Sequence, residues 1–263
     1  MIELVKTPTS NAFYNLVSNC NNEMILCAPF IKSETVNEIL RVKKDSSRLT
    51  VITSSNISNF IQNSSDLSAI KKLLESNATV LNYQNLHAKI YMFDKLKALI
   101  TSANLTYSGM NRNYEYGVLI DKDETTMDQI ETDFIEMLYS ELAGQYHLSD
   151  IKSIESIIRT IKSSTYSVEE IEGENTLIIE DVDTLLNDMS SWKKDVFLVL
   201  NEISNNDFTL NDVYVFKELI AAKHPNNHNV NDKIRQILQY LRDMGLIKFV
   251  SPGRYKKLFK IKI

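Results

Sequence analysis

Apolar residues along the first half of the chain follow two alternating patterns. Short continuous apolar runs are typical of buried β-strands, whereas apolar residues spaced three or four apart are typical of helices. We expect strands over 23–31, 48–54, 79–81 and 114–121. We expect helices over 11–18, 33–42, 66–76 and 124–142, the second of them with Ser33 as its N-cap. Strands that alternate with helices predict an α/β domain with a layered central sheet.

Polar residues that could take part in catalysis gather in Leu86–Asn104, which we expect to form two strands joined by a turn. His87 and Lys89 lie two residues apart, so on a strand they share one face, and Ser102 and Asn104 repeat this spacing. The imidazole, ammonium, hydroxyl and carboxamide would then line one side of a hairpin. Such a set of groups can hold a phosphate and attack it.

The spacing of these residues carries a resemblance to a known family. The pattern His87-x-Lys89-x4-Asp94-x6-Thr101-Ser102-x-Asn104 resembles the signature of the phospholipase D superfamily, except that Thr101 stands where the family usually has glycine. The resemblance implies that His87 attacks phosphorus and forms a phosphohistidine. It implies that Lys89 and Asn104 bind the non-bridging oxygens, that Ser102 supports them, and that Asp94 is structural. It also implies that the reaction uses no metal ion and no cofactor. A plain hairpin with exposed polar residues is the alternative.

The family often carries a downstream acidic residue that orients the histidine, and Glu115 is our candidate, although an exposed strand glutamate fits the pattern equally well. The family's chemistry also uses a second histidine, which protonates the leaving oxygen. Histidines occur at positions 87, 147, 224 and 228, and only His87 lies in a His-x-Lys pattern. We therefore expect a homodimer in which two copies of His87 complete one site.

Composition and charge narrow the class of protein. A hydrophobic content of 43% and a charged content of 24% are ordinary for a soluble globular chain, and no run approaches a membrane span or a signal peptide. We expect a cytoplasmic protein without membrane contact, in which Cys27 is a core residue rather than a metal ligand. The formal charge is −4 over residues 1–144, −7 over 145–191 and +6 over 192–263. A basic end on an acidic chain favours a polyanion as its partner.

The basic end has the pattern of a winged helix, which is three helices followed by a β-hairpin. The first helix is expected over Trp192–Ile203, and Thr209 opens the second, with Asp212 three residues later as in a capping box. A third helix ends near Gly245, and strands over Leu246–Val250 and Tyr255–Lys260 make the hairpin.

This module resembles the winged-helix domain found at the C-terminus of several restriction endonucleases. The residues that carry the resemblance are Phe208-Thr209-Leu210-x-Asp212-x-Tyr214-x-Phe216, His224-Pro225-x-Asn227, Ile234-Arg235-Gln236-x-Leu238-Gln239-x-Leu241-Arg242-Asp243-x-Gly245 and Gly253-x-Tyr255. One member of that group reads N6-methyladenine, so methylated DNA is a candidate target.

Candidate DNA contacts follow from residue type. The free face of the third helix carries Arg235, Gln236 and Gln239, which suit base edges in the major groove. The wing carries Arg254, Lys256 and Lys257, which suit phosphates. A winged helix used for protein contact is the alternative.

These expectations divide the chain into a phospholipase D-like nuclease domain (1–144), an acidic linker (145–191) and a winged-helix DNA-recognition domain (192–263). The linker carboxylates Glu169, Glu170, Glu172 and Glu174 could imitate DNA phosphates and restrain cutting, although a solvated linker explains them as well.

The chain as a whole predicts a metal-independent, site-specific endonuclease acting on double-stranded DNA, of the type II restriction kind. A cognate methyltransferase is a candidate partner. The alternatives are a non-catalytic DNA-binding regulator and a phosphodiesterase acting on RNA or methylated DNA. A lipid phosphodiesterase is disfavoured by the winged helix.

Overall fold

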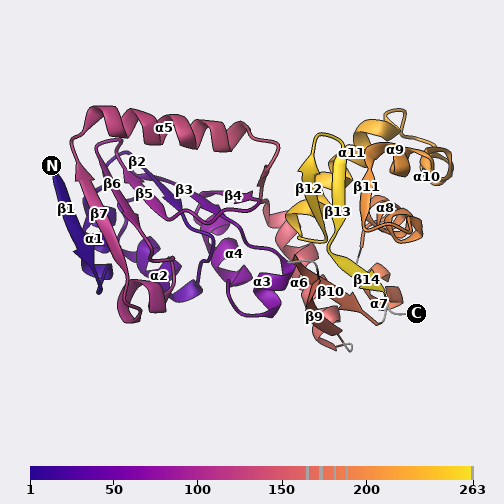
Figure 1. The fold of residues 1–263 in the computed structure, drawn as a ribbon, viewed down its shortest axis with the longest axis horizontal. Helices are drawn as coiled ribbons and strands as arrows, with labels where there is room; N and C mark the ends of the chain where they lie inside the picture. The colour runs from indigo at the N-terminus through magenta and orange to yellow at the C-terminus, as the bar shows by residue number, and fades with distance from the viewer. Residues whose placement is uncertain (164–165, 172–173, 181, 188, 262–263) are drawn as a thin grey trace. The chain divides into compact units, whose positions relative to one another are not determined.

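The computed structural model describes residues 1–163, 166–171, 174–180, 182–187 and 189–261. The chain folds as two compact units, both drawn in Figure 1. The first unit comprises Met1–Ser55 and Gln62–Ile151, and the second comprises Asn56–Ile61 and Lys152–Ile263. None of the helices in the described ranges combines the length and the apolar character that crossing a bilayer requires.

A mixed sheet forms the centre of the first unit. Its strands lie in the order β1-β7-β6-β5-β2-β3-β4-β8. Their bounds are β1 Ile2–Lys6, β2 Glu23–Cys27, β3 Arg48–Thr53, β4 Thr79–Tyr83, β5 Ile90–Phe93, β6 Lys97–Thr101, β7 Tyr116–Asp121 and β8 Ala143–Gln145. Strands β2, β3 and β4 run parallel, and every other neighbouring pair is antiparallel. The parallel strands follow from the predicted alternation with helices, since a crossover helix is the usual link between them.

Helices cover both faces of this sheet (Figure 1). One face carries α1 Ser10–Asn19, α2 Ser33–Val42 and α4 Leu67–Glu75, and the other carries α5 Glu124–Tyr139. On the α5 face, Met127, Ile130 and Phe134 pack against sheet residues that include Cys27 and Met92. The α/β layered fold that the sequence predicts is therefore confirmed.

Local details differ from the sequence-based expectations. Lys32, not Ser33, is the N-cap of α2, because Ser33 is already the first residue of the helix. The Ser33 N–H donates to the Asp66 carboxylate at 2.9 Å. His87 and Lys89 do not lie on a strand, because the ladder of β5 begins only at Ile90, opposite Cys27. Strands β1 and β8 at the two edges of the sheet were not predicted.

The second unit contains the winged helix. Its helices are α8 Ser191–Glu202, α9 Leu210–Tyr214, α10 Lys217–Lys223 and α11 Val230–Asp243, and its sheet has the order β11-β13-β12 from Asp207–Thr209, Arg254–Lys257 and Ile247–Ser251. The capping box of Thr209 and Asp212 is present as predicted. The second predicted helix is broken at Val215 and Phe216 into α9 and α10. Ile57 of α3 (Ile57–Ile61) also belongs to this unit, and its N–H donates to the Met244 carbonyl at 3.0 Å.

The acidic segment that was expected to be a linker contributes to the second unit. It forms α6 Leu148–Ser163, β9 Tyr166–Ile171, β10 Glu174–Ile179 and α7 Val182–Asn187. β10 lies between β9 and β14 (Phe259–Ile261) in a second three-stranded sheet. Glu174 pairs with Lys248 at 2.6 Å, whereas Glu172 and the expected turn at Gly173 lie outside the described residues. Restraint of cutting by this segment stays a prediction.

Candidate active site

His87 and Lys89 occupy an irregular segment between β4 and β5. The Lys89 side chain is buried, with 8% of the residue exposed, whereas His87 is exposed. Lys89 Nζ donates to the His87 carbonyl oxygen at 2.7 Å and lies 3.4 Å from His87 Nδ1. Burial lowers the pKa of Lys89, and the Glu115 carboxylate partly opposes this effect. The segment therefore holds a cation directly beside an accessible imidazole.

Ser102 and Asn104 directly follow β6, at the same end of the sheet, because β6 runs antiparallel to β5. The Ser102 N–H donates to the Tyr116 carbonyl at 3.0 Å, and the Tyr91 hydroxyl donates to the Ala103 carbonyl at 2.6 Å. These bonds fix the backbone between the two site residues. Within the described part of the chain, the buried Oδ1 of Asn104 has no hydrogen-bond partner. A buried acceptor of this kind is satisfied when a ligand or a water donates to it.

Glu115 lies just before β7 and joins the same end of the sheet. Its carboxylate accepts hydrogen bonds from Ser102 Oγ and from Asn113 Nδ2, the latter at 3.1 Å. The Glu115 carboxylate thus accepts a hydrogen bond from Ser102 and also acts electrostatically on Lys89. The hydrogen bonds described for the Glu115 carboxylate go to Ser102 and Asn113, and its role in orienting the histidine stays a prediction. The alternative of an exposed strand glutamate is wrong, because Glu115 is buried.

Thr7 and Asn113 also position Glu115, and neither of them is identified from the sequence. The Glu115 N–H donates to Thr7 Oγ1 at 2.7 Å, and the Thr7 hydroxyl also bonds the Asn113 carbonyl. Asn113 could have been suspected, because it lies two residues before Glu115. Thr7 could not, because it is more than a hundred residues away in the sequence.

Thr101 departs from the family pattern, and the structure shows how it is accommodated. Thr101 lies opposite Gly117 in the β6–β7 ladder. A Cβ added at Gly117 would lie 2.8 Å from the Thr101 Cβ and 2.6 Å from the Ile100 carbonyl oxygen. The glycine that the motif lacks is thus replaced by one on the neighbouring strand, which leaves room for the larger side chain.

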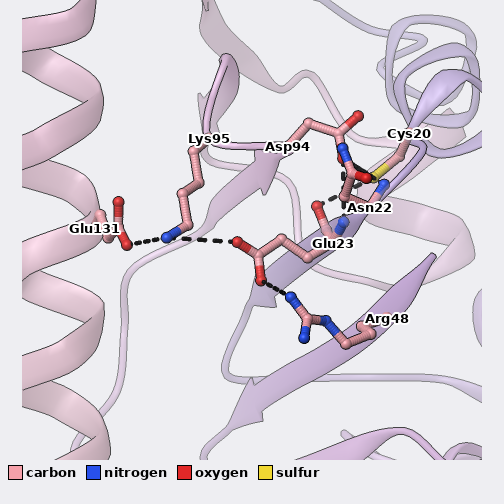
Figure 2. A network of polar contacts seen from close by, with 7 residues as sticks. All are labelled: Cys20, Asn22, Glu23, Arg48, Asp94, Lys95 and Glu131. Atoms are coloured by element: carbon pink, nitrogen blue, oxygen red, sulfur yellow. Dashed lines mark hydrogen bonds and ion pairs between the residues drawn. The ribbon is translucent and has the colours of Figure 1, made fainter.

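Asp94 lies at the other end of β5, roughly 16 Å from Lys89 at the usual strand rise. Its carboxylate accepts from the N–H groups of Asn21, Asn22 and Glu23 at 2.8, 2.7 and 3.1 Å. Burial alone would raise the pKa of Asp94, but these donors lower it below its usual value. Figure 2 shows Asp94 with Asn22 and Glu23, and the ion pairs that extend from Glu23 to Arg48 and Lys95. The contacts are those of a structural residue, as the motif implies.

The predicted DNA-contacting residues of the second unit separate into two groups. Arg235, Gln236 and Gln239 are exposed on α11, and Arg254 is exposed on the wing, with Lys256 half-buried. Lys257 is buried, and its ammonium donates to the carbonyl oxygens of Leu200 and Ile203, the first at 3.2 Å. Burial also lowers the pKa of Lys257. The expectation that Lys257 faces phosphate is therefore wrong.

Comparisons with known proteins agree with this architecture. Residues 13–138 match the family model described as cardiolipin synthase, PLD-like domain, and residues 188–257 match that of the Dam-replacing HTH domain. The chain therefore carries a phospholipase D-like domain followed by a C-terminal winged-helix domain.

Individual relatives are more distant. The DISARM protein DrmC of Bacillus paralicheniformis is 50% identical over 38 residues, which are 14% of this chain and 16% of that protein. Among solved structures, the phospholipase D family member Nuc from Salmonella typhimurium is 12% identical, with a TM-score of 0.48, over 56% of this chain and 98% of Nuc. NucT from Helicobacter pylori is 18% identical, with a TM-score of 0.46, over 56% of this chain and 99% of NucT.

Proposed function

We propose that this protein is a metal-independent, site-specific DNA endonuclease of the type II restriction kind, which cuts through a covalent phosphohistidine at His87. The observation that supports it most directly is the buried Lys89 ammonium held against the exposed His87. A phosphodiester placed there would meet a nucleophile and a positive charge in one location.

The reaction would proceed in two steps. A ring nitrogen of His87 forms a bond to phosphorus while the bond to the leaving oxygen breaks, and a second histidine donates a proton to that oxygen. Water then attacks the phosphohistidine, the same second histidine takes a proton from it, and the bond to His87 breaks. Lys89 and Asn104 bind the non-bridging oxygens, where charge builds up in the transition state. Ser102 donates a hydrogen bond to the Glu115 carboxylate, and the negative charge of Glu115 favours the ammonium form of Lys89.

The second histidine would come from a second copy of the chain. Each chain has one histidine in the motif, His87, whereas the reaction needs two imidazoles at one phosphate. A two-fold axis passing beside His87 would bring both copies together, and this symmetry is the commonest one among oligomers.

DNA recognition would fall to the winged helix. Arginine pairs with guanine and glutamine with adenine in the major groove, and α11 presents Arg235, Gln236 and Gln239 to solvent. Arg254 and Lys256 on the wing would contact phosphates. An enzyme of this kind would leave host DNA intact only if a methyltransferase modified its sites, or if it cut only methylated DNA.

Digestion of genomic DNA in excess EDTA tests the proposal. We expect the wild-type chain to cut either unmodified or methylated DNA and His87→Ala to bind the same DNA without cutting it. His147→Ala is the matched control, since His147 is also an exposed histidine of the first unit. Cutting by His87→Ala, or complete loss of wild-type cutting in EDTA, would contradict the mechanism. Binding of every DNA without cleavage would instead identify a non-catalytic regulator, and cleavage of RNA alone would identify a ribonuclease.

A further inference from the structure

Three exposed tyrosines lie between Asn104 and the first residue of β7, which is Tyr116. Tyr107 is 45% exposed, Tyr114 is 84% exposed and Tyr116 is 47% exposed. A tyrosine ring offers a large apolar area that folding usually buries, so three exposed rings within ten residues need an explanation. All three are close in sequence to site residues, because Tyr107 is three residues after Asn104 and Tyr114 and Tyr116 flank Glu115.

The backbone that carries these rings is held firmly. Met110 is fully buried, and the Asn113 N–H donates to the Ser108 carbonyl at 2.8 Å. Gly109 packs so closely on Asn104 that an added Cβ would lie 2.7 Å from the Asn104 carbonyl oxygen. The turn η1 (Ser108–Arg112) is π-helical, a rare form that is frequent at functional sites. The rings are therefore presented by a fixed support.

The charges around the rings favour a polyanion. The Arg112 guanidinium carbon lies 5.7 Å from the centre of the Tyr107 ring, and Lys6 lies directly opposite Tyr116 in the β1–β7 ladder. Both cations are exposed. The acidic residue of the segment 101–118 is Glu115, which is buried and hydrogen-bonded to Ser102 and Asn113. The surface around the tyrosines thus combines rings with positive charge, the combination that binds single-stranded nucleic acids.

We propose that Tyr107, Tyr114 and Tyr116 form a stacking surface for unpaired bases, so that the catalytic core takes a single strand. Arg112 and Lys6 would contact the phosphates of that strand. The inference rests on the proposed function, because the stacked strand is the one that enters the His87 site. A duplex keeps its base faces covered by neighbouring bases and cannot use such a surface. The winged helix would then bind duplex DNA, while the core would cut a strand that is unpaired at the cleavage position.

Binding of a fluorescent oligonucleotide to the full-length chain tests the proposal in a His87→Ala background, where no cutting interferes. We expect Tyr107→Ala and Tyr114→Ala each to weaken binding of a single strand about tenfold, which corresponds to about 1.4 kcal/mol for a lost stacking contact. The phenylalanine variants keep the ring and should bind as before. Tyr139→Ala is the matched control, because Tyr139 is 87% exposed at the end of α5, four residues before β8 at the opposite edge of the sheet.

The same variants are measured on the duplex of the same sequence, where affinity should stay unchanged. Equal single-strand affinity of the alanine variants and the control would overturn the inference. So would a dimer that becomes a monomer on Tyr114→Ala in sedimentation, because the rings would then belong to a contact between two copies. If His87→Ala still cuts DNA, the proposed mechanism fails, yet the binding measurement still decides whether the tyrosines hold a strand.

Discussion

The Lys89 ammonium lies 2.7 Å from the carbonyl oxygen of His87 and 3.4 Å from Nδ1 of the same residue. The Lys89 ammonium is thus hydrogen-bonded to the backbone of His87, the nucleophile of the motif. This bond helps to fix the backbone that carries the imidazole. Burial makes this charge costly to keep, and the Glu115 carboxylate offsets part of the cost. The charge state of Lys89 should therefore control activity at alkaline pH.

The pH dependence of cleavage gives the first prediction. Lys89 is active as an ammonium, so activity should fall as the pH rises through its pKa. Because burial lowers this pKa, the fall should begin below the value of about 10.4 that is usual for lysine. Glu115→Gln removes the charge that raises the pKa of Lys89, so the fall should move to lower pH. Initial cleavage rates in chelator across the alkaline range measure this shift.

Glu124→Gln is the control for that experiment, because Glu124 is an exposed carboxylate of α5 in the same unit. Its alkaline profile should match the wild type. An alkaline limit that stays in place in Glu115→Gln would show that Lys89 does not set it.

Asp94 gives a prediction about stability. Three backbone N–H groups bond its carboxylate, and Asp94→Asn replaces a charged acceptor by a weaker neutral one. We expect a loss of about 1–2 kcal/mol in the free energy of unfolding at neutral pH, at the modest end because the side chain is partly solvated.

The sign of the pH dependence follows from the lowered pKa of Asp94. The stabilisation is present above the unfolded pKa of about 3.9, and it is lost as the pH falls through the lower folded value. The difference between Asp94→Asn and the wild type in urea unfolding should therefore shrink in acid. Asp128→Asn, on the exposed side of α5, should show no such difference at any pH. A difference for Asp94→Asn that stayed constant down to strong acid would argue against an ionised carboxylate there.

The two basic groups of the winged helix should respond differently to substitution. Arg235 is exposed on α11 and forms a long ion pair of 3.6 Å with Asp232, so Arg235→Ala should leave folding intact. It should weaken specific duplex binding by about 1–3 kcal/mol, as expected for one lost base contact. Lys257→Met should instead lower the free energy of unfolding by about 1–3 kcal/mol, because the buried Leu200 carbonyl and the part-buried Ile203 carbonyl lose their donor.

Duplex affinity by anisotropy and unfolding in urea separate these two effects. The folded Lys257→Met chain should bind DNA as the wild type does. If Lys257→Met weakened DNA binding without a loss of stability, the result would show that Lys257 contacts DNA.

Much of the fold could be predicted because its signals are local. The helices α2 and α4, the strands β2 and β3, and the capping box of Thr209 with Asp212 each follow from neighbouring residues. Strand β1 could not be predicted, because it exists only through pairing with β7 more than a hundred residues away. Its exposed Ile2 and Leu4 give no buried pattern to recognise. The start of β5 at Ile90 depends in the same way on where β2 ends.

The candidate site shows the same limit. The sequence predicted that His87 and Lys89 belong together, but the bonds from Thr7 to the Glu115 backbone depend on strand pairing across the sheet. Lys257 is a different case, because successive strand residues point to opposite faces. Lys256 and Lys257 could not both face outward from the wing, so this error was visible in the alternation of β13.

A mixing experiment tests whether two chains share one site. If each site needs His87 from both copies, a dimer of one wild-type and one His87→Ala chain should be inactive. Random pairing of equal amounts would then leave about a quarter of the dimers active, whereas chains that act alone would leave about half of the total activity. The chains are co-expressed with different tags, so that pairing occurs during folding, and cleavage is measured per total protein. His147→Ala in place of His87→Ala should cause no loss. Activity near one half, or a monomer in sedimentation that still cuts, would place a complete site within a single chain.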